Sequence, residues 1–165
     1  MSIRFNADEI FEMAEQIERN GARFYRKAAK GCAQDVQTSK LLLHLAEMED
    51  HHEKIFHQMR QHLPNKDRGW EMFDPEGQVA QYLRAFAGGH VFNVQENACD
   101  RLTGAEERDD ILRIAIGMEK DSIVFYRGIQ EMVPEKLGKD KIDDIIREEM
   151  KHITLLSTEM TAARS

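Results

Sequence analysis

The stretch LLHLAEMEDHHEKIFHQM, residues 42–59, combines the apolar periodicity of a helix with a polar pair at the centre of its apolar face. Steps of three and four residues from Leu42 trace a stripe that is apolar at both ends and carries Glu49 and His52 in its middle. Residues three apart lie one turn apart on the same face of a helix, so both side chains point the same way. The stretch therefore predicts a buried helix with a glutamate and a histidine in its core face.

Three further segments show the same design. A second Glu-x-x-His pair, formed by Glu149 and His152, lies in the middle of an apolar stripe within residues 139–162. The two remaining stripes carry one central glutamate each, Glu18 and Glu119. The predicted core positions are Phe11, Ala14, Glu18, Gly21, Tyr25 and Ala28; Leu42, Leu45, Glu49, His52, Phe56, Met59 and Leu63; Leu112, Ala115, Glu119, Ser122, Tyr126, Ile129 and Val133; and Ile142, Ile145, Glu149, His152 and Leu156.

The two halves of the chain repeat each other at an interval of 100 or 101 residues. The segments IERNGARFYR (17–26) and MEKDSIVFYR (118–127) share a glutamate, a phenylalanine, a tyrosine and an arginine at matching positions. A helix pair repeated once predicts a bundle with approximate two-fold symmetry, and that symmetry suits a site for two metal ions. The same interval relates the central polar residues, in the pairs Glu18 and Glu119, Glu49 and Glu149, and His52 and His152.

Capping and breaking signals place the first pair of helices. Asn6 with Glu9 is a candidate capping box for a helix over 7–30, and Gly31 is expected to end that helix. A second helix is predicted over 36–62, and it stops before a proline.

The second pair of helices has similar signals. Thr103 with Glu106 is a candidate capping box for a helix over 104–132, which a proline follows. Gly138 is a break that opens the last predicted helix, over 139–162.

The connection between the pairs, residues 63–103, is too long for a tight turn and too rich in large apolar residues for a disordered linker. We expect it to contain one or two short helices, with Gly88 and Gly89 as a break. Short connections within each pair and a long one between the pairs suit a bundle with one crossover. The sequence therefore predicts an all-α four-helix bundle that forms a single domain over 1–165.

Charge, hydropathy and cysteine content disfavour several classes of function. A net charge of −7 disfavours nucleic acid or an anionic membrane surface as the main partner, because both need clustered Lys and Arg. No apolar run approaches the roughly 20 residues that span a bilayer, so no membrane is expected. The N-terminal segment is amphipathic and acidic and lacks the apolar stretch of a secretory signal, so the expected location is the cytoplasm. Cys32 and Cys99 stand alone, and without a C-x-x-C pair neither a zinc ribbon nor a thioredoxin motif is available.

The central glutamates need compensation. An ionised carboxylate buried without a partner costs several kcal/mol, so four of them in one core predict a reason for their presence. Four glutamates balance two divalent cations, and two neutral imidazoles complete a ligand set of the kind found in di-iron and di-manganese bundles. The alternative is a set of separately satisfied polar residues, or a decayed site.

On these residues the chain resembles the ferritin-like superfamily and, within it, the rubrerythrins. The resemblance rests on IERNGARFY (17–25), LAEMEDHH (45–52), AIGMEKDSIVFY (115–126) and REEMKH (147–152). It implies a ferritin-like four-helix bundle with two metal ions, of which iron is favoured and manganese or a mixed pair are alternatives. It also implies that Glu49 and Glu149 bridge the metals and that the di-iron(II) site reacts with hydrogen peroxide or dioxygen. The implied ligands are Glu18, Glu49, His52, Glu119, Glu149 and His152.

Two departures from the rubrerythrin pattern matter. The chain has no rubredoxin-like domain with paired C-x-x-C motifs, so electrons would come from a separate donor protein. Rubrerythrins resemble one another in a seventh carboxylate one turn after the glutamate of the third long helix, and here that position is Ser122. This serine puts the ligand exchange of the family, and full peroxidase activity, in question.

Other polar residues near the stripes have two interpretations each. Tyr25 and Tyr126 lie two turns after the central glutamates of their helices, so their hydroxyls either hydrogen-bond the ligating carboxylates or belong to ordinary aromatic packing. Glu15 and Glu148 are register alternatives to the neighbouring ligands, although the stripe and the repeat disfavour both. Glu15 could also control access to the site.

The sequence therefore predicts a cytoplasmic di-iron oxidoreductase that reduces peroxide or dioxygen with electrons from a partner protein. An iron-handling protein, with ferroxidase, storage or delivery activity, would use the same ligands. A third alternative is a non-enzymatic helical bundle with a relic site. The family and the apolar crossover favour a homodimer.

Overall fold

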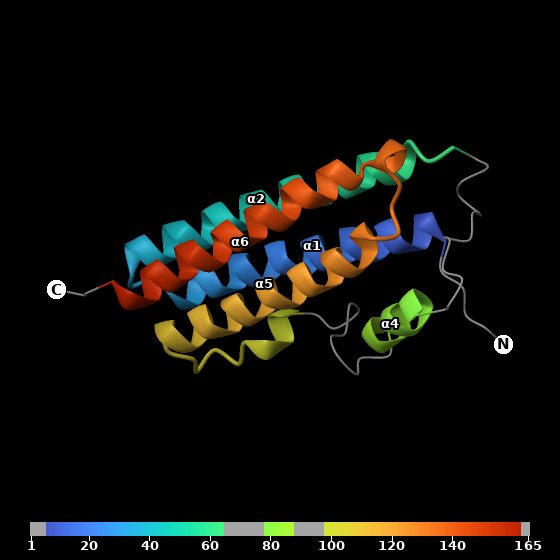
Figure 1. Cartoon of the computed structure of the whole chain (residues 1–165). Helices are drawn as coiled ribbons and strands as arrows, with labels where there is room; N and C mark the ends of the chain where they lie inside the picture. The colour runs from blue at the N-terminus through green and yellow to red at the C-terminus, as the bar shows by residue number, and fades with distance from the viewer. Residues whose placement is uncertain (1–5, 65–77, 88–97, 163–165) are drawn as a thin grey trace.

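The structure is a computed structural model that describes residues 6–64, 78–87 and 98–162 (Figure 1). The chain forms an all-helical bundle, as the sequence predicts. The four long helices are α1 (Ala7–Gly31), α2 (Val36–Gln61), α5 (Arg108–Gln130) and α6 (Lys139–Thr161). The short helices are α4 (Gln78–Ala87) and the 3₁₀ turns η1 (Ala98–Arg101) and η2 (Glu135–Leu137).

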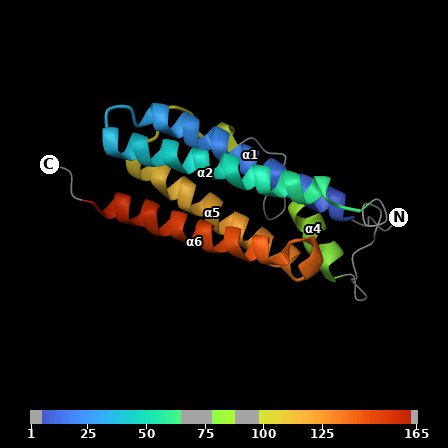
Figure 2. The same cartoon turned by 90° about the horizontal axis from the view of Figure 1, so that it is seen from above.

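The bundle consists of two antiparallel helix pairs laid side by side. Helix α1 packs along α2 and α5 packs along α6, and the pairs meet where α1 contacts α5 and α2 contacts α6 (Figure 2). Helices α1 and α6 run in one direction and α2 and α5 in the other (Figure 1). Because α2 and α5 run in the same direction, the chain needs the long crossover to return between the pairs. No helix in the described parts of the chain is long and apolar enough to cross a membrane.

Hydrogen bonds to the backbone define both ends of α1. The capping box is present, since the Asn6 side chain accepts from the Glu9 N–H and the Glu9 carboxylate accepts from the Asn6 N–H, both at 2.9 Å. Gly31 was expected to end α1, but the helix continues through it and is capped by Cys32 at φ −99°. No left-handed residue is needed there, because the Cys32 N–H still reaches the carbonyl of Ala28.

The start of α5 differs from the prediction. The carboxylate of Glu106 accepts hydrogen bonds from the Thr103 N–H and hydroxyl at 2.7 and 2.6 Å and from the Gly104 N–H at 2.9 Å. These bonds lower the pKa of Glu106 to about 2. They close a turn rather than a helix, because Gly104 has φ +91°, and α5 begins only at Arg108. The predicted break at Gly138 is present, with φ +98°.

The apolar core is divided into two clusters by a polar layer. One cluster lies at the end of the bundle that holds Phe11, Phe56 and Ile142, and the other surrounds Leu45 and Leu112. All the predicted stripe positions are buried. The layer between the clusters contains Glu18, Glu49, His52, Glu119, Ser122, Glu149 and His152.

The crossover contains short helices, as predicted, and α4 packs on α5. Leu83 is buried in the bundle core, and the Tyr82 hydroxyl donates a hydrogen bond to the carbonyl of Val124. A Cβ atom at Gly128 would lie 2.0 Å from the Tyr82 ring, so the absent side chain lets the ring approach the helix. The predicted break at Gly88 and Gly89 lies outside the described residues.

A pair of glycine substitutions on α5 tests this contact. Gly117→Ala has open space around its new methyl group and should stabilise the protein by about 0.5–1 kcal/mol through helix propensity. Gly128→Ala gains the same propensity but must displace Tyr82, so its melting temperature should fall below that of the wild type. Calorimetry of both variants measures the difference, and equal stabilisation would mean that α4 does not rest on this face.

Candidate metal centre

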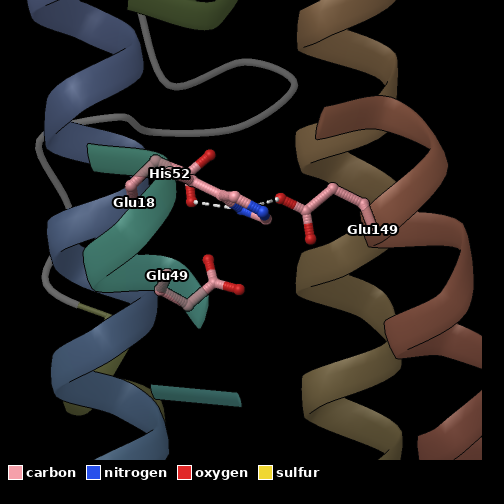
Figure 3. Close-up of side chains that lie close together, drawn as sticks. All are labelled: Glu18, Glu49, His52 and Glu149. Atoms are coloured by element: carbon pink, nitrogen blue, oxygen red, sulfur yellow. Dashed lines mark ion pairs between the residues drawn. The ribbon is translucent and has the colours of Figure 1, made fainter. Parts of the chain in front are cut away.

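The structure brings all six predicted ligand residues together in the polar layer. Their side chains come from all four long helices and form two overlapping groups. Within each group, one possible ligand atom per residue lies within 4.8 Å of every other, and Figure 3 shows the first group converging between the helices. The groups are Glu18, Glu49, His52 and Glu149, and Glu49, Glu119, Glu149 and His152.

Both histidines direct the same ring nitrogen at the carboxylates. Nδ1 of His52 lies 3.0 Å from Oε1 of Glu149 and 3.5 Å from Oε2 of Glu18. Nδ1 of His152 lies 2.8 Å from Oε2 of Glu149, and it is 3.3 Å from Glu119 and 3.4 Å from Glu49. The two rings lie nearly parallel, with centroids 5.7 Å apart. Glu149 therefore places one oxygen beside each histidine.

Most of the inward-facing atoms of these residues have no hydrogen-bond partner. The six residues are at most 4% exposed. Eight buried side-chain N and O atoms in the described parts of the chain make no hydrogen bond, and six of them belong to Glu18, Glu49, His52, Glu149 and His152. Buried polar atoms are normally satisfied, so a group of them facing one another indicates a missing partner. Four carboxylates and two imidazole nitrogens are a donor set that fits two divalent cations in place of that partner.

Burial and mutual repulsion shift the protonation of the glutamates. Desolvation and the neighbouring carboxylates raise the pKa of Glu119 to about 8 and hold that of Glu49 well above its usual range. For His152, burial alone would lower the pKa, but the adjacent carboxylates override it and raise the value to about 12. The same balance raises the pKa of His52. A cation that binds here must therefore displace protons.

Two tyrosines support the carboxylates from the opposite helix pair. The Tyr25 hydroxyl donates to Oε1 of Glu119, and the Tyr126 hydroxyl donates to Oε1 of Glu18. Each bond crosses between α1 and α5, so each tyrosine serves the glutamate of the other helix rather than its own. Burial, followed by the charge of nearby glutamates, raises the pKa of both phenols well above the usual value, so both stay protonated donors. Of the two interpretations of these tyrosines, the hydrogen-bonding one holds.

The two register alternatives occupy different places. Glu148 faces α2, where its carboxylate lies 2.6 Å from Nε2 of His52. Glu15 is buried one turn from the centre and lies 3.4 Å from His57 and 3.7 Å from Arg60. Neither belongs to the two ligand groups. Glu148 was missed as a partner of a ligand, because the periodicity of α6 does not show which side chain of another helix it reaches.

Gly21 also has a role that the stripe alone did not reveal. A Cβ atom there would lie 2.7 Å from Oε2 of Glu49, so glycine makes room for the carboxylate. Ser122 occupies the matching position of the repeat and is also buried. The absence of a side chain at position 21 thus leaves space in the layer for one of the two shared glutamates.

Comparison with known proteins agrees with this geometry. The rubrerythrin family model matches residues 9–160. The chain belongs to the rubrerythrin family. Among solved structures, a candidate ferritin-like diiron-carboxylate protein from Thermotoga maritima has the same fold, with a TM-score of 0.68 and 22% sequence identity, covering 97% of this chain and 98% of the other. No functionally curated protein matches the chain in sequence. The resemblance inferred from the motifs is thus confirmed at the level of family and fold.

A methyl group at position 21 should weaken metal binding. Gly21→Ala pushes Glu49 away from the layer. We expect a loss of roughly 10- to 100-fold in Mn(II) affinity, the range seen when a residue that orients a metal ligand is replaced. Mn(II) should raise the melting temperature of the wild type more than that of the variant. Gly117→Ala is the matched control, and an equal Mn(II) effect in both variants would contradict the assigned position of Glu49.

The metal-free protein should lose stability as the pH rises. The folded-state pKa values of Glu119 and His152, about 8 and about 12, lie above their ordinary values. The folded protein therefore holds more protons than the unfolded chain between about pH 6 and pH 8, and its free energy of unfolding falls across that interval. Urea titrations of chelator-treated protein measure this slope. Glu119→Gln should flatten it, whereas stability that rises with pH in the wild type would refute the protonation pattern.

Proposed function

We propose that the protein is a di-iron oxidoreductase that reduces hydrogen peroxide, or dioxygen, with electrons from a separate donor protein. Its family membership and its donor set support iron as the metal. The residues that would hold it are Glu18, Glu49, His52, Glu119, Glu149 and His152.

The observation that carries this proposal is the overlap of the two ligand groups. Glu49 and Glu149 belong to both groups, so cations held by them would lie next to each other. Adjacent metals suit a substrate with two bonded oxygen atoms. Bound there, a pair of iron ions would supply two electrons and Lewis acidity toward the O–O bond.

The protein itself sets the conditions for this chemistry. Reduction of hydrogen peroxide to two water molecules takes two electrons and two protons. Apolar clusters above and below the layer exclude bulk water, which strengthens electrostatic interactions within it. Tyr25 and Tyr126 hold the carboxylates of Glu119 and Glu18 in place through their hydroxyl groups. The raised pKa of Glu119 makes its carboxyl group a place where a proton can be held near neutral pH.

Iron handling is the second candidate function. It is favoured by Ser122, which stands where the rubrerythrin pattern has a seventh carboxylate. Such a protein would oxidise many Fe(II) ions per chain and retain the product, whereas the proposed reductase oxidises only the iron of its own centre and is then reduced again.

Rapid mixing of anaerobic Fe(II)-loaded protein with limiting hydrogen peroxide separates these functions. We expect two Fe(II) to be oxidised per peroxide, faster than with dioxygen, and the iron to stay bound through repeated rounds of chemical reduction. Glu149→Gln should abolish the reaction, while Glu47→Gln, an exposed glutamate on α2, should leave it unchanged. Consumption of a large excess of Fe(II) per chain, with no faster reaction with peroxide, would replace the proposal with the iron-handling function.

A further inference from the structure

The two halves of the metal centre differ behind their histidines. The Nε2 atom of His52 lies 2.6 Å from the carboxylate of Glu148, which reaches across from α6 with a side chain 35% exposed. The described residues offer no such partner to Nε2 of His152. The repeat explains the difference, because the position that corresponds to Glu148 in the first half of the chain is Met48.

The contact with Glu148 determines which nitrogen of His52 is available to a cation. A carboxylate oxygen accepts a hydrogen bond from a ring N–H, so the contact with Glu148 places a ring proton of His52 on Nε2. When a cation displaces the proton on Nδ1, the lone pair is left on that atom, which lies 3.0 Å from Glu149 and faces the ligand group. The same contact fixes the plane of the ring, which is fully buried.

We propose that Glu148 is a positioning residue that makes the position of His52 the tighter of the two metal positions, so that a divalent cation fills it first. This inference rests on the metal centre of the proposed function and adds an order of loading to it. The group that fills first is Glu18, Glu49, His52 and Glu149.

The candidate ligands and their tyrosine partners are matched between the halves, so they do not favour either position. Each half has three glutamates and one histidine, the shared pair is common to both, and each terminal glutamate accepts a tyrosine hydroxyl. Partners that orient a ligating histidine typically change metal affinity by about 10- to 100-fold. The difference between the two positions should fall in that range.

Glu148 also joins α2 to α6, so a purely structural role must be distinguished. A structural role predicts that its loss lowers the stability of the metal-free protein and weakens both metal positions alike. A positioning role predicts a selective loss at the position of His52, with the second position unchanged.

The test uses one equivalent of Co(II) per chain under anaerobic conditions. Anomalous diffraction from crystals grown with that amount reports the occupancy of each position, and visible absorption during a titration reports the two affinities in solution. In the wild type we expect Co(II) at the position of His52 in at least roughly tenfold excess over the position of His152.

Two substitutions remove the difference between positions 48 and 148, one by taking the carboxylate away and the other by adding a second one. Glu148→Met gives both halves a methionine and should equalise the occupancies by weakening the first position alone. Met48→Glu gives both halves a carboxylate and should equalise them by strengthening the second, which keeps the test valid if Glu148→Met folds poorly. Glu47→Gln, one residue from position 48, is the control and should leave the preference unchanged.

The outcomes separate this inference from the proposed function. Equal filling in the wild type, first filling at His152, or a preference that survives both Glu148→Met and Met48→Glu would overturn the role of Glu148 while leaving the dinuclear centre intact. Absence of Co(II) from both positions would overturn the metal centre itself, and the order of loading with it.

Discussion

The burial of four glutamates in one layer of a helical core is the constraint on which the rest of this structure depends. Their carboxylates repel one another and lose hydration, so the layer is stable only with compensating charge. Two histidines supply positive charge, as would cations bound in the layer, and two tyrosine hydroxyls donate hydrogen bonds to the carboxylates. Gly21 leaves room for Glu49. The apolar clusters on both sides keep the layer dry and hold the four helices in register. The bundle thus stabilises an arrangement that would be unfavourable on its own.

Much of this arrangement could be predicted because helical periodicity and the repeat constrain the same residues. The stripes placed every ligand candidate in the core, and the fold followed from four such stripes with one long connection. Local hydrogen bonding was harder to predict. The Thr103 and Glu106 pair has the sequence of a capping box, yet Gly104 adopts a left-handed conformation and delays the helix. The contact of Glu148 with His52 depends on how α6 sits against α2, which no pattern within a single helix determines.

The two halves of the centre are alike where the sequence repeat is kept and differ where it is not. Candidate ligands and tyrosines occur in matching pairs, which suits a site for two metal ions. Positions 48 and 148 break the match, as methionine and glutamate. Ser122 marks a further departure from the rubrerythrin pattern, and the six candidate ligand residues remain without a seventh carboxylate at that position.

The central claim is that the buried layer holds two metal ions, and an anaerobic Fe(II) titration of the metal-free protein tests it most directly. After desalting, the iron content per chain should reach a plateau of about two, as in other dinuclear carboxylate bundles. In Glu149→Gln, which removes a carboxylate shared by both ligand groups, the plateau should fall below one. A wild-type plateau near zero would contradict the account, because the six converging side chains would then need a different explanation.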